Sequence, residues 1–327
     1  MQWRGRRQSS NIEDRRGQGG GLGGGLGRGG PFGGRGPFGG GGPFGGGGGP
    51  FGGGGRGPFG MGPRSRFGGG MGLMIVVVLI ILFSGNFFGD KTQQPGVNNP
   101  AITGGGTTGG KAGSDATRDF VAVVLADTED VWNAKFKAIG AQYEEPALVL
   151  FSGSIDSACG YAQSASGPFY CPGDRKVYID LSFFEELATR FDAPGDFAQA
   201  YVIAHEVGHH VQNLMGVMAK VDNLRPGLGR AEQNALSVKV ELQADCFAGV
   251  WAHDTQAAKG VIEAGDIEEA LGAASGVGDD RIQKQAQGHV VPDAFTHGSA
   301  EQRMRWFSRG FQSGDIKTCD TFTAAQL

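Results

Sequence analysis

The sequence predicts a mainly helical domain with a small β-sheet, an α+β fold, behind a long segment without regular structure. Three observations support this prediction. Glycine supplies 63 of the 327 residues and is concentrated before residue 70. One long apolar run follows, and apolar residues then recur mostly at helical spacing. About 240 residues remain for a core, which suits one domain and excludes a large multidomain assembly.

Residues 1–70 are dominated by glycine, with arginine as their only basic residue type and Glu13 and Asp14 as their only acids. Such a segment has too few apolar side chains to offset the entropy lost when its backbone is ordered. We therefore expect residues 1–70 to be disordered and cytoplasmic. A Pro-Phe-Gly repeat recurs in this segment, and we interpret it as a tether. The alternative is contact with anionic lipid or nucleic acid, although the repeat predicts no specific nucleic acid partner.

The apolar run at residues 71–88 is long enough to cross a bilayer as one helix, and it is the only such run, which excludes a polytopic transporter. Arginines precede it and Asp90 follows it, so the positive-inside rule predicts a cytoplasmic amino terminus. The run lacks the short basic head and small-residue exit of a cleaved signal peptide. We predict a single-pass membrane protein with a linker at residues 89–115 and an extracytoplasmic domain at residues 116–327.

The chain has four cysteines, at Cys159, Cys171, Cys246 and Cys319. Of the three possible pairings, we expect Cys159 with Cys171, which flank a turn-rich segment, and Cys246 with Cys319. In an oxidising compartment these pairs would be structural disulfides. A cysteine zinc site is the alternative, but no C-x-x-C spacing occurs.

Apolar spacing and turn residues predict the order of elements within the domain. The segment 147–151 has the composition of a strand, and 169–180 that of a hairpin. Helices are expected over 119–138, 181–191, 197–214, 231–253 and 299–311. The small sheet is therefore expected before most of the helices.

The helix expected at residues 197–214 carries the motif H-E-x-x-H. His205 and His209 are four residues apart, so their imidazoles project from one helical face at the separation that a single zinc ion needs. The Glu206 carboxylate lies where it could accept a proton from a zinc-bound water that attacks a carbonyl. Apolar flanks indicate a buried helix, in which surface histidines are not expected.

The next expected helix supplies a third ligand. Glu241 would complete a His₂Glu set for one zinc ion per chain. Asp245, one turn later on the same face, could accept a hydrogen bond from a ligand histidine and so orient it. The alternative is a helix with ordinary surface acids.

H-E-x-x-H followed by E-x-x-A-D resembles zinc endopeptidases with a glutamate third ligand, including the CAAX-protease-like group. More closely, the chain resembles the bacterial neutral zinc metallopeptidase family, through its first 17 residues, the apolar run, the cysteine-flanked segment, both helices of the motif and Thr296 to Arg303. The resemblance implies a zincin-like peptidase domain that acts on protein or peptide substrates. With the predicted topology, it implies a protein of the bacterial inner (cytoplasmic) membrane whose domain is periplasmic.

These features predict a membrane-anchored zinc metallopeptidase, and we expect an endopeptidase. The alternative is a zinc-stabilised binding or scaffold module that has lost hydrolysis, but the intact Glu206 argues against it. A second electrophile is needed near the metal, because zinc only partly neutralises the oxyanion. His297 is the candidate through resemblance to a His-Pro…Arg element of CAAX-protease-like enzymes, with Gly298 in place of the proline. Tyr161 is the rival donor.

Overall fold

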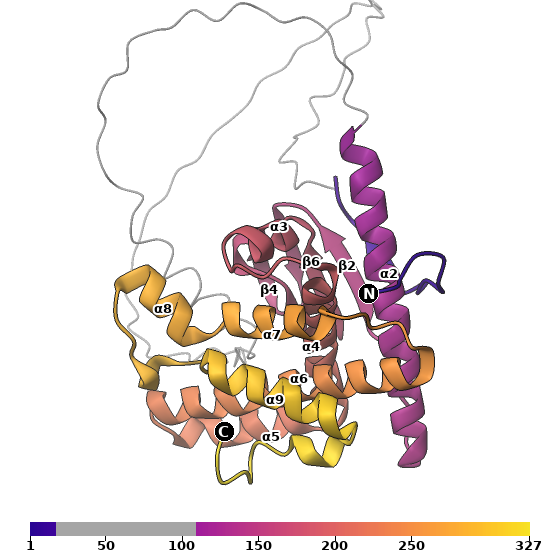
Figure 1. Ribbon diagram of the computed structural model, residues 1–327. Helices are drawn as coiled ribbons and strands as arrows, with labels where there is room; N and C mark the ends of the chain where they lie inside the picture. Colours follow the sequence, from indigo (N-terminus) through magenta and orange to yellow (C-terminus); the bar gives the residue numbers. More distant parts are fainter. Residues whose placement is uncertain (18–108) are drawn as a thin grey trace, which may run out of the picture. The chain divides into compact units, whose positions relative to one another are not determined.

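The computed structural model describes residues 1–17 and 109–327 of the chain (Figure 1). The span predicted at residues 71–88 and most of the predicted linker lie outside these residues. Within the described ranges, no helix combines the length and the apolar character needed to cross a bilayer.

The sheet has four strands in the order β1-β2-β6-β5. Strands β1 and β6 run parallel to β2, whereas β5 pairs with β6 as an antiparallel hairpin, which confirms the hairpin predicted from the turn residues. A separate antiparallel pair, β3 with β4, leads from the end of β2 toward β5. The strands are β1 (Ile12–Asp14), β2 (Ala147–Phe151), β3 (Ser154–Ser157), β4 (Gly160–Gln163), β5 (Phe169–Cys171) and β6 (Lys176–Asp180).

Helices make up most of the described domain, as the apolar spacing predicted. They are α2 (Gly109–Ala138), α3 (Ser182–Thr189), α4 (Asp196–Leu214), α5 (Val217–Leu224), α6 (Arg230–Lys259), α7 (Asp266–Gly276), α8 (Asp279–Gln287) and α9 (Ala300–Ser313). Short 3₁₀ turns lie at Ser164–Ser166, Arg225–Gly227, Pro292–Ala294 and Ile316–Cys319. Mainly helical structure with a small sheet is therefore confirmed.

The first 17 residues form part of this fold, so the prediction of disorder throughout residues 1–70 is wrong at its beginning. Strand β1 lies beside β2 at the edge of the sheet, with Ile12 opposite Leu148. The side chain of Met1 is buried, and its amino group lies 2.7 Å from a carboxylate oxygen of Asp196. Figure 1 shows this segment next to α2.

Ion pairs and backbone contacts with α2 hold the segment in place. Arg6 donates to Asp127 over 2.6 Å, and Arg7 donates to Glu129 over 2.9 Å. The Ser9 backbone N–H also donates to the carbonyl of Ala122. Composition gave no sign of this order, because the acidic partners lie more than a hundred residues away in the sequence.

Helices α4, α6 and α9 pack closely enough to bring their side chains to one place. A side chain at Gly208 of α4 would begin 3.0 Å from the carbonyl oxygen of Ala244 on α6. A side chain at Gly310 of α9 would begin 1.9 Å from the carbonyl oxygen of Cys246 on α6. Glycine at these two positions therefore allows the backbone of α6 to contact both neighbouring helices.

Candidate metal centre

One face of α4 forms the base of a cleft. Its residues there follow the helical repeat, with Tyr201, Val202, His205, Glu206 and His209 all lining the cleft. The helix is buried along almost its whole length, as its apolar flanks predicted. The predicted role of the motif as a buried, functional face therefore agrees with its position.

His205, His209 and Glu241 form one buried group. Their nearest ligand atoms all lie within 4.8 Å of one another. Nε2 of His205 is 3.2 Å, and Nε2 of His209 is 3.5 Å, from the Glu241 carboxylate. Two imidazoles and one carboxylate are a typical zinc ligand set. The three predicted ligands are thus brought together across α4 and α6, and they fit a zinc ion.

Asp245 fixes the ring of His205. Its Oδ1 accepts a hydrogen bond from Nδ1 of His205 over 2.8 Å, which leaves Nε2 free for a metal. The same carboxylate pairs with Arg303 of α9 over 2.9 Å and accepts from the Tyr201 hydroxyl. Burial alone would raise the pKa of Asp245, but Arg303 and His205 lower it to about 2. The orienting role predicted for Asp245 is therefore consistent with its contacts.

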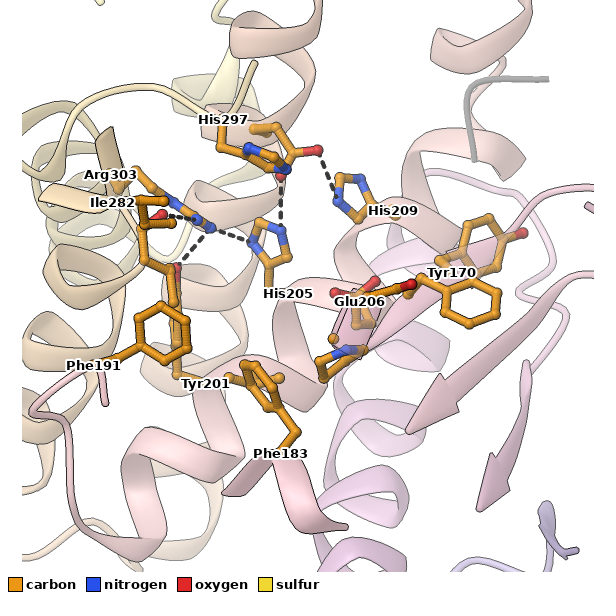
Figure 2. Close-up of a pocket in the computed structure, with 17 residues that line it drawn as sticks. Tyr170, Phe183, Phe191, Tyr201, His205, Glu206, His209, Ile282, His297 and Arg303 are labelled. Carbon is orange, nitrogen blue, oxygen red and sulfur yellow. Dashed lines mark hydrogen bonds and ion pairs between the residues drawn. The ribbon is translucent and has the colours of Figure 1, made fainter. Parts of the chain in front are cut away.

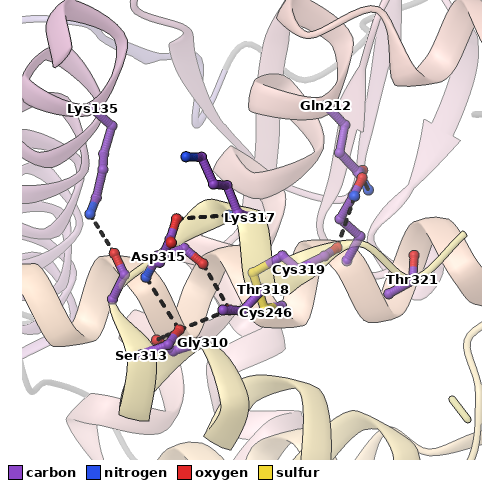
Figure 3. The surroundings of a disulfide bond; sticks show 12 residues. Lys135, Gln212, Cys246, Gly310, Ser313, Asp315, Lys317, Thr318, Cys319 and Thr321 are labelled. Atoms are coloured by element: carbon purple, nitrogen blue, oxygen red, sulfur yellow. Dashed lines mark hydrogen bonds between the residues drawn. A yellow bond between two sulfur atoms is a disulfide. The ribbon is translucent and has the colours of Figure 1, made fainter. Parts of the chain in front are cut away.

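His209 is fixed by a different chain of contacts. Oε1 of Gln212 accepts from its Nδ1 over 2.9 Å, so Nε2 again faces Glu241. The Gln212 amide donates to Gln243, which in turn donates to the carbonyl of Cys319 over 3.0 Å. Figure 3 shows Gln212 near the disulfide that joins Cys246 of α6 to Cys319.

The two predicted disulfides are present. Cys246 pairs with Cys319, and Cys159 pairs with Cys171, and the described part of the chain has no free cysteine. The Cys246–Cys319 disulfide joins the carboxy-terminal segment to α6, the helix that carries Glu241.

Glu206 differs from Glu241 in its surroundings. Within the described residues, its carboxylate has no hydrogen bond to protein, although only 8% of the residue is exposed. Burial raises its pKa, partly offset by His209 and His205. A carboxylate with a raised pKa and free oxygens at a cleft suits a group that accepts and returns a proton.

His297 reaches the same cleft from the loop before α9. Its Nδ1 lies 3.1 Å from Oδ1 of Asp279, whose other oxygen accepts the backbone N–H of His297 over 2.6 Å. Burial lowers the pKa of His297, but Asp279 outweighs this effect and raises it. Asp279 therefore stabilises the charged form of this imidazole relative to a free histidine, and the contact through Nδ1 leaves Nε2 toward the cleft.

Figure 2 shows how the labelled side chains are distributed around the cleft. His205 and His209 lie beside one another, with His297 near them. Phe183, Phe191 and Ile282 gather on the side of His205, whereas Tyr170 lies on the opposite side. The side chains of Phe183, Phe191 and Ile282 therefore form an apolar side of the cleft next to His205.

Tyr161 is not brought to the metal ligands. It lies on β4, is 56% exposed and does not line the cleft. The structure thus favours His297 over Tyr161 as the donor near the metal.

Sequence reasoning missed Tyr201, Gln212 and Asp279. Tyr201 precedes His205 by four residues, so helical spacing alone could have placed it on the same face. Gln212 follows His209 by three residues and could have been found in the same way. Asp279 gives no such signal, because it lies 18 residues before His297 and on another helix.

Comparisons with known proteins agree with this site. Residues 44–322 match the family described as "Putative neutral zinc metallopeptidase". The chain belongs to this family. It is 44% identical to "Uncharacterized protein YpfJ" of Escherichia coli (strain K12) over 322 residues, which cover 98% of this chain and 99% of that protein. It is 46% identical to "Uncharacterized protein Rv2575" of Mycobacterium tuberculosis over 232 residues, 66% of this chain and 75% of that protein. No solved structure matches the chain.

Membership of this family supports the resemblance drawn from H-E-x-x-H and E-x-x-A-D. It also explains why a zinc ligand set is found in the cleft. Because the described residues carry the complete set, a zinc ion would be held by His205, His209 and Glu241.

Proposed function

We propose that this domain hydrolyses peptide bonds in protein or peptide substrates. The observation that carries the proposal is the pairing of a buried His₂Glu group with a neighbouring glutamate, Glu206, whose carboxylate has no hydrogen bond to the residues that the structure describes. Zinc, when bound, would supply Lewis acidity toward the scissile carbonyl. The remaining steps can be assigned to side chains of the chain itself.

Glu206 accepts a proton from the water while the oxygen of that water bonds to the carbonyl carbon. When the carbon–nitrogen bond breaks, Glu206 returns that proton to the leaving amine. His297 donates a hydrogen bond to the oxygen that becomes negative in the intermediate. Asp279 holds the His297 ring and favours its charged form.

The position of β5 supports cleavage within a chain. This strand is the last in the sheet order, so one of its edges has no partner strand among the described residues. Residues 166–170, which include part of β5, line the cleft. An extended peptide can bind such an edge through its main chain and pass the metal ligands, which suits an endopeptidase.

We also propose that the domain works outside the cytoplasm of a bacterium, attached to the inner membrane through residues 71–88. The two disulfides support an oxidising compartment, because such bonds persist mainly there. The apolar character of residues 71–88 supports the attachment.

The test is to present a peptide library to the zinc-loaded full chain and to its Glu206→Gln variant. We expect the wild type to cleave and the variant to be slower by about 10²- to 10⁴-fold, the range for loss of an acid–base group. Zinc content, measured by elemental analysis, should be equal in the two. Equal cleavage would identify a contaminant, and zinc loss comparable to that of His205→Ala would remove Glu206 from the proton-transfer role.

A further inference from the structure

We propose that the apolar side of the cleft is a subsite for a large aliphatic or aromatic side chain of the substrate, on a residue directly joined to the scissile bond. This inference rests on the proposed function, because it concerns the same cleft. It goes further by naming the chemistry that the substrate must present.

The apolar side is built by side chains from separate parts of the chain. Phe183 belongs to α3 and Phe191 follows it, and their ring centroids are 6.2 Å apart. Val202 comes from α4, and Ile282 from α8. Val277, between α7 and α8, completes the group. Because no member of this group carries a charge, it would favour an apolar side chain over a charged one.

The arginine that lines the cleft is already paired with an acid. Arg303 lines the cleft, but its guanidinium donates to both oxygens of Asp245 and to the Tyr201 hydroxyl. A substrate carboxylate would therefore have to compete with a buried ion pair. Arg303 is therefore not a free partner for a substrate carboxylate, and the uncharged side chains of the group favour an apolar one.

The position of Val202 relates the subsite to the reacting bond. Val202 precedes Glu206 by four residues, which is slightly more than one helical turn and about 6 Å along the axis. Consecutive Cα atoms of a peptide are about 3.8 Å apart. A substrate whose carbonyl lies near Glu206 would thus place an adjacent side chain, rather than a remote one, against Val202.

The wall of the subsite is held before any ligand arrives. A side chain at Gly276 would begin 2.4 Å from the carbonyl oxygen of Phe191, so the end of α7 contacts the backbone of Phe191 directly. This contact fixes the backbone position from which the Phe191 side chain projects. A preformed apolar pocket loses little entropy when a side chain enters it.

Binding can be measured without hydrolysis in zinc-loaded Glu206→Gln full chain. Fluorescent peptides would differ at one position only, which carries Phe, Leu, Ala or Asp. We expect Phe and Leu peptides to bind about 10- to 100-fold more tightly than Ala or Asp peptides, the range for burial of a large apolar side chain. Equal affinities for the four peptides would overturn the subsite.

A second variant tests the location. Ile282→Phe should fill the subsite and abolish the preference for Phe, while the affinity for the Ala peptide changes less than about threefold. Ile139→Phe is the matched control, because Ile139 is 57% exposed and does not line the cleft. An unchanged preference in Ile282→Phe would contradict the assignment.

Cleavage by the wild type separates the two proposals. If the wild type cuts and the favoured residue adjoins the cut, the subsite is supported. If it cuts but the favoured residue lies elsewhere, the subsite is wrong and the peptidase function stands. If it cuts no peptide while Glu206→Gln keeps the preference, the apolar binding site stands and the peptidase function is wrong.

The packing of residues 1–17 carries a second inference, which is independent of catalysis. We infer that this segment lies on the same side of the membrane as the domain. Strand β1 pairs with β2 along its whole length, and Arg6 and Arg7 reach the acids of α2. A strand and its neighbour in one sheet cannot be separated by a bilayer. A single crossing at residues 71–88 would place the segment and the domain on opposite sides. The inference therefore replaces both the cytoplasmic amino terminus and the single-pass topology predicted from the sequence, and an attachment through residues 71–88 then leaves both parts on one side.

Thiol labelling of spheroplasts, whose inner membrane is intact and whose outer membrane is opened, tests this inference. Gln8→Cys and Ile139→Cys place single exposed thiols in the amino-terminal segment and in the domain, in a chain whose own cysteines are paired. A membrane-impermeant maleimide should label both positions or neither. Labelling of Ile139→Cys alone, with Gln8→Cys labelled only after lysis, would place the two on opposite sides and overturn the inference.

Discussion

The amino-terminal segment (residues 1–17) and helix α4 both bring charged side chains into the domain, but the chain encodes them differently. In α4, His209 shares a face with His205, four residues before it, and with Glu206, three residues before it. In the segment, Arg6 and Arg7 find acids 121 and 122 residues away. Local spacing therefore reveals the first arrangement, whereas only tertiary contact creates the second.

Both regions also contain clustered acidic side chains. The acidic group that meets Met1 contains Asp196, Asp266 and Glu269, whose carboxylates lie as close together as the zinc ligands do. Here the amino group of Met1 supplies the positive charge, at 2.7 Å from Asp196 and 3.1 Å from Asp266. Clustered acids can thus serve packing in one region and metal binding in another, and the nature of the nearby donors distinguishes the two.

The largest effect should come from the ligand itself. Glu241→Ala should abolish measurable zinc binding at concentrations that saturate the wild type, because it leaves two ligands. Asp245→Ala should weaken zinc binding by about 10- to 100-fold, since it only orients His205. Competition with a chelator gives both affinities. Full zinc occupancy in both variants would contradict the ligand assignment, and the face of α4 would then have no demonstrated role in zinc binding.

Loss of His297 should come next. His297→Ala should lower kcat by about 10²-fold or more, as removal of one oxyanion donor does, with zinc content and melting temperature unchanged. Tyr161→Phe is the control, because that side chain is exposed and away from the cleft, and it should keep the wild-type kcat. A large fall in Tyr161→Phe with no fall in His297→Ala would reverse the roles.

A smaller effect is expected from the disulfide behind the metal ligands. Cys246→Ala with Cys319→Ala should lower the free energy of unfolding by roughly 2–4 kcal/mol. Zinc affinity should also fall, because Cys319 contacts Gln243 and through Gln212 supports His209. Denaturant unfolding and chelator competition measure the two. The double variant of Cys159 and Cys171 is the control, and we expect it to keep the zinc affinity. Equal zinc affinity in the two double variants would show that the Gln212 pathway does not support the metal ligands.

The smallest effect should come from the amino-terminal segment. Arg6→Ala should lower the free energy of unfolding by about 1 kcal/mol, because Asp127 keeps its second partner Lys259 at 2.7 Å. Zinc affinity should not change. Arg4→Ala, which alters an exposed arginine of the same segment, should change stability less. A change of zinc affinity in Arg6→Ala would show that the amino-terminal segment and the metal-ligand group are not independent.

Elements with strong local patterns could be predicted from the sequence. The helices that carry His205 and Glu241 lie where apolar spacing placed them, and the hairpin of β5 and β6 matches its turn residues. Their ends were less well placed. Helix α2 begins at Gly109, ten residues before the expected start, and α6 continues to Lys259. Helix ends depend on what the terminal turns contact, and a local pattern does not contain this information.

The sequence by itself predicted the H-E-x-x-H face of α4, the two disulfides and the order of most elements, because each depends on spacing within a helix, a turn or a small set of cysteines. Glu241 joins that face only through the packing of α6 beside α4. Tertiary structure alone decided that residues 1–17 join the sheet, that Asp279 holds His297 and that Tyr161 stays outside the cleft. These outcomes depend on which distant surfaces meet. The physical reason is that a helix fixes the direction of its own side chains, whereas the partner of a loop or an edge strand is chosen only when the rest of the chain has packed.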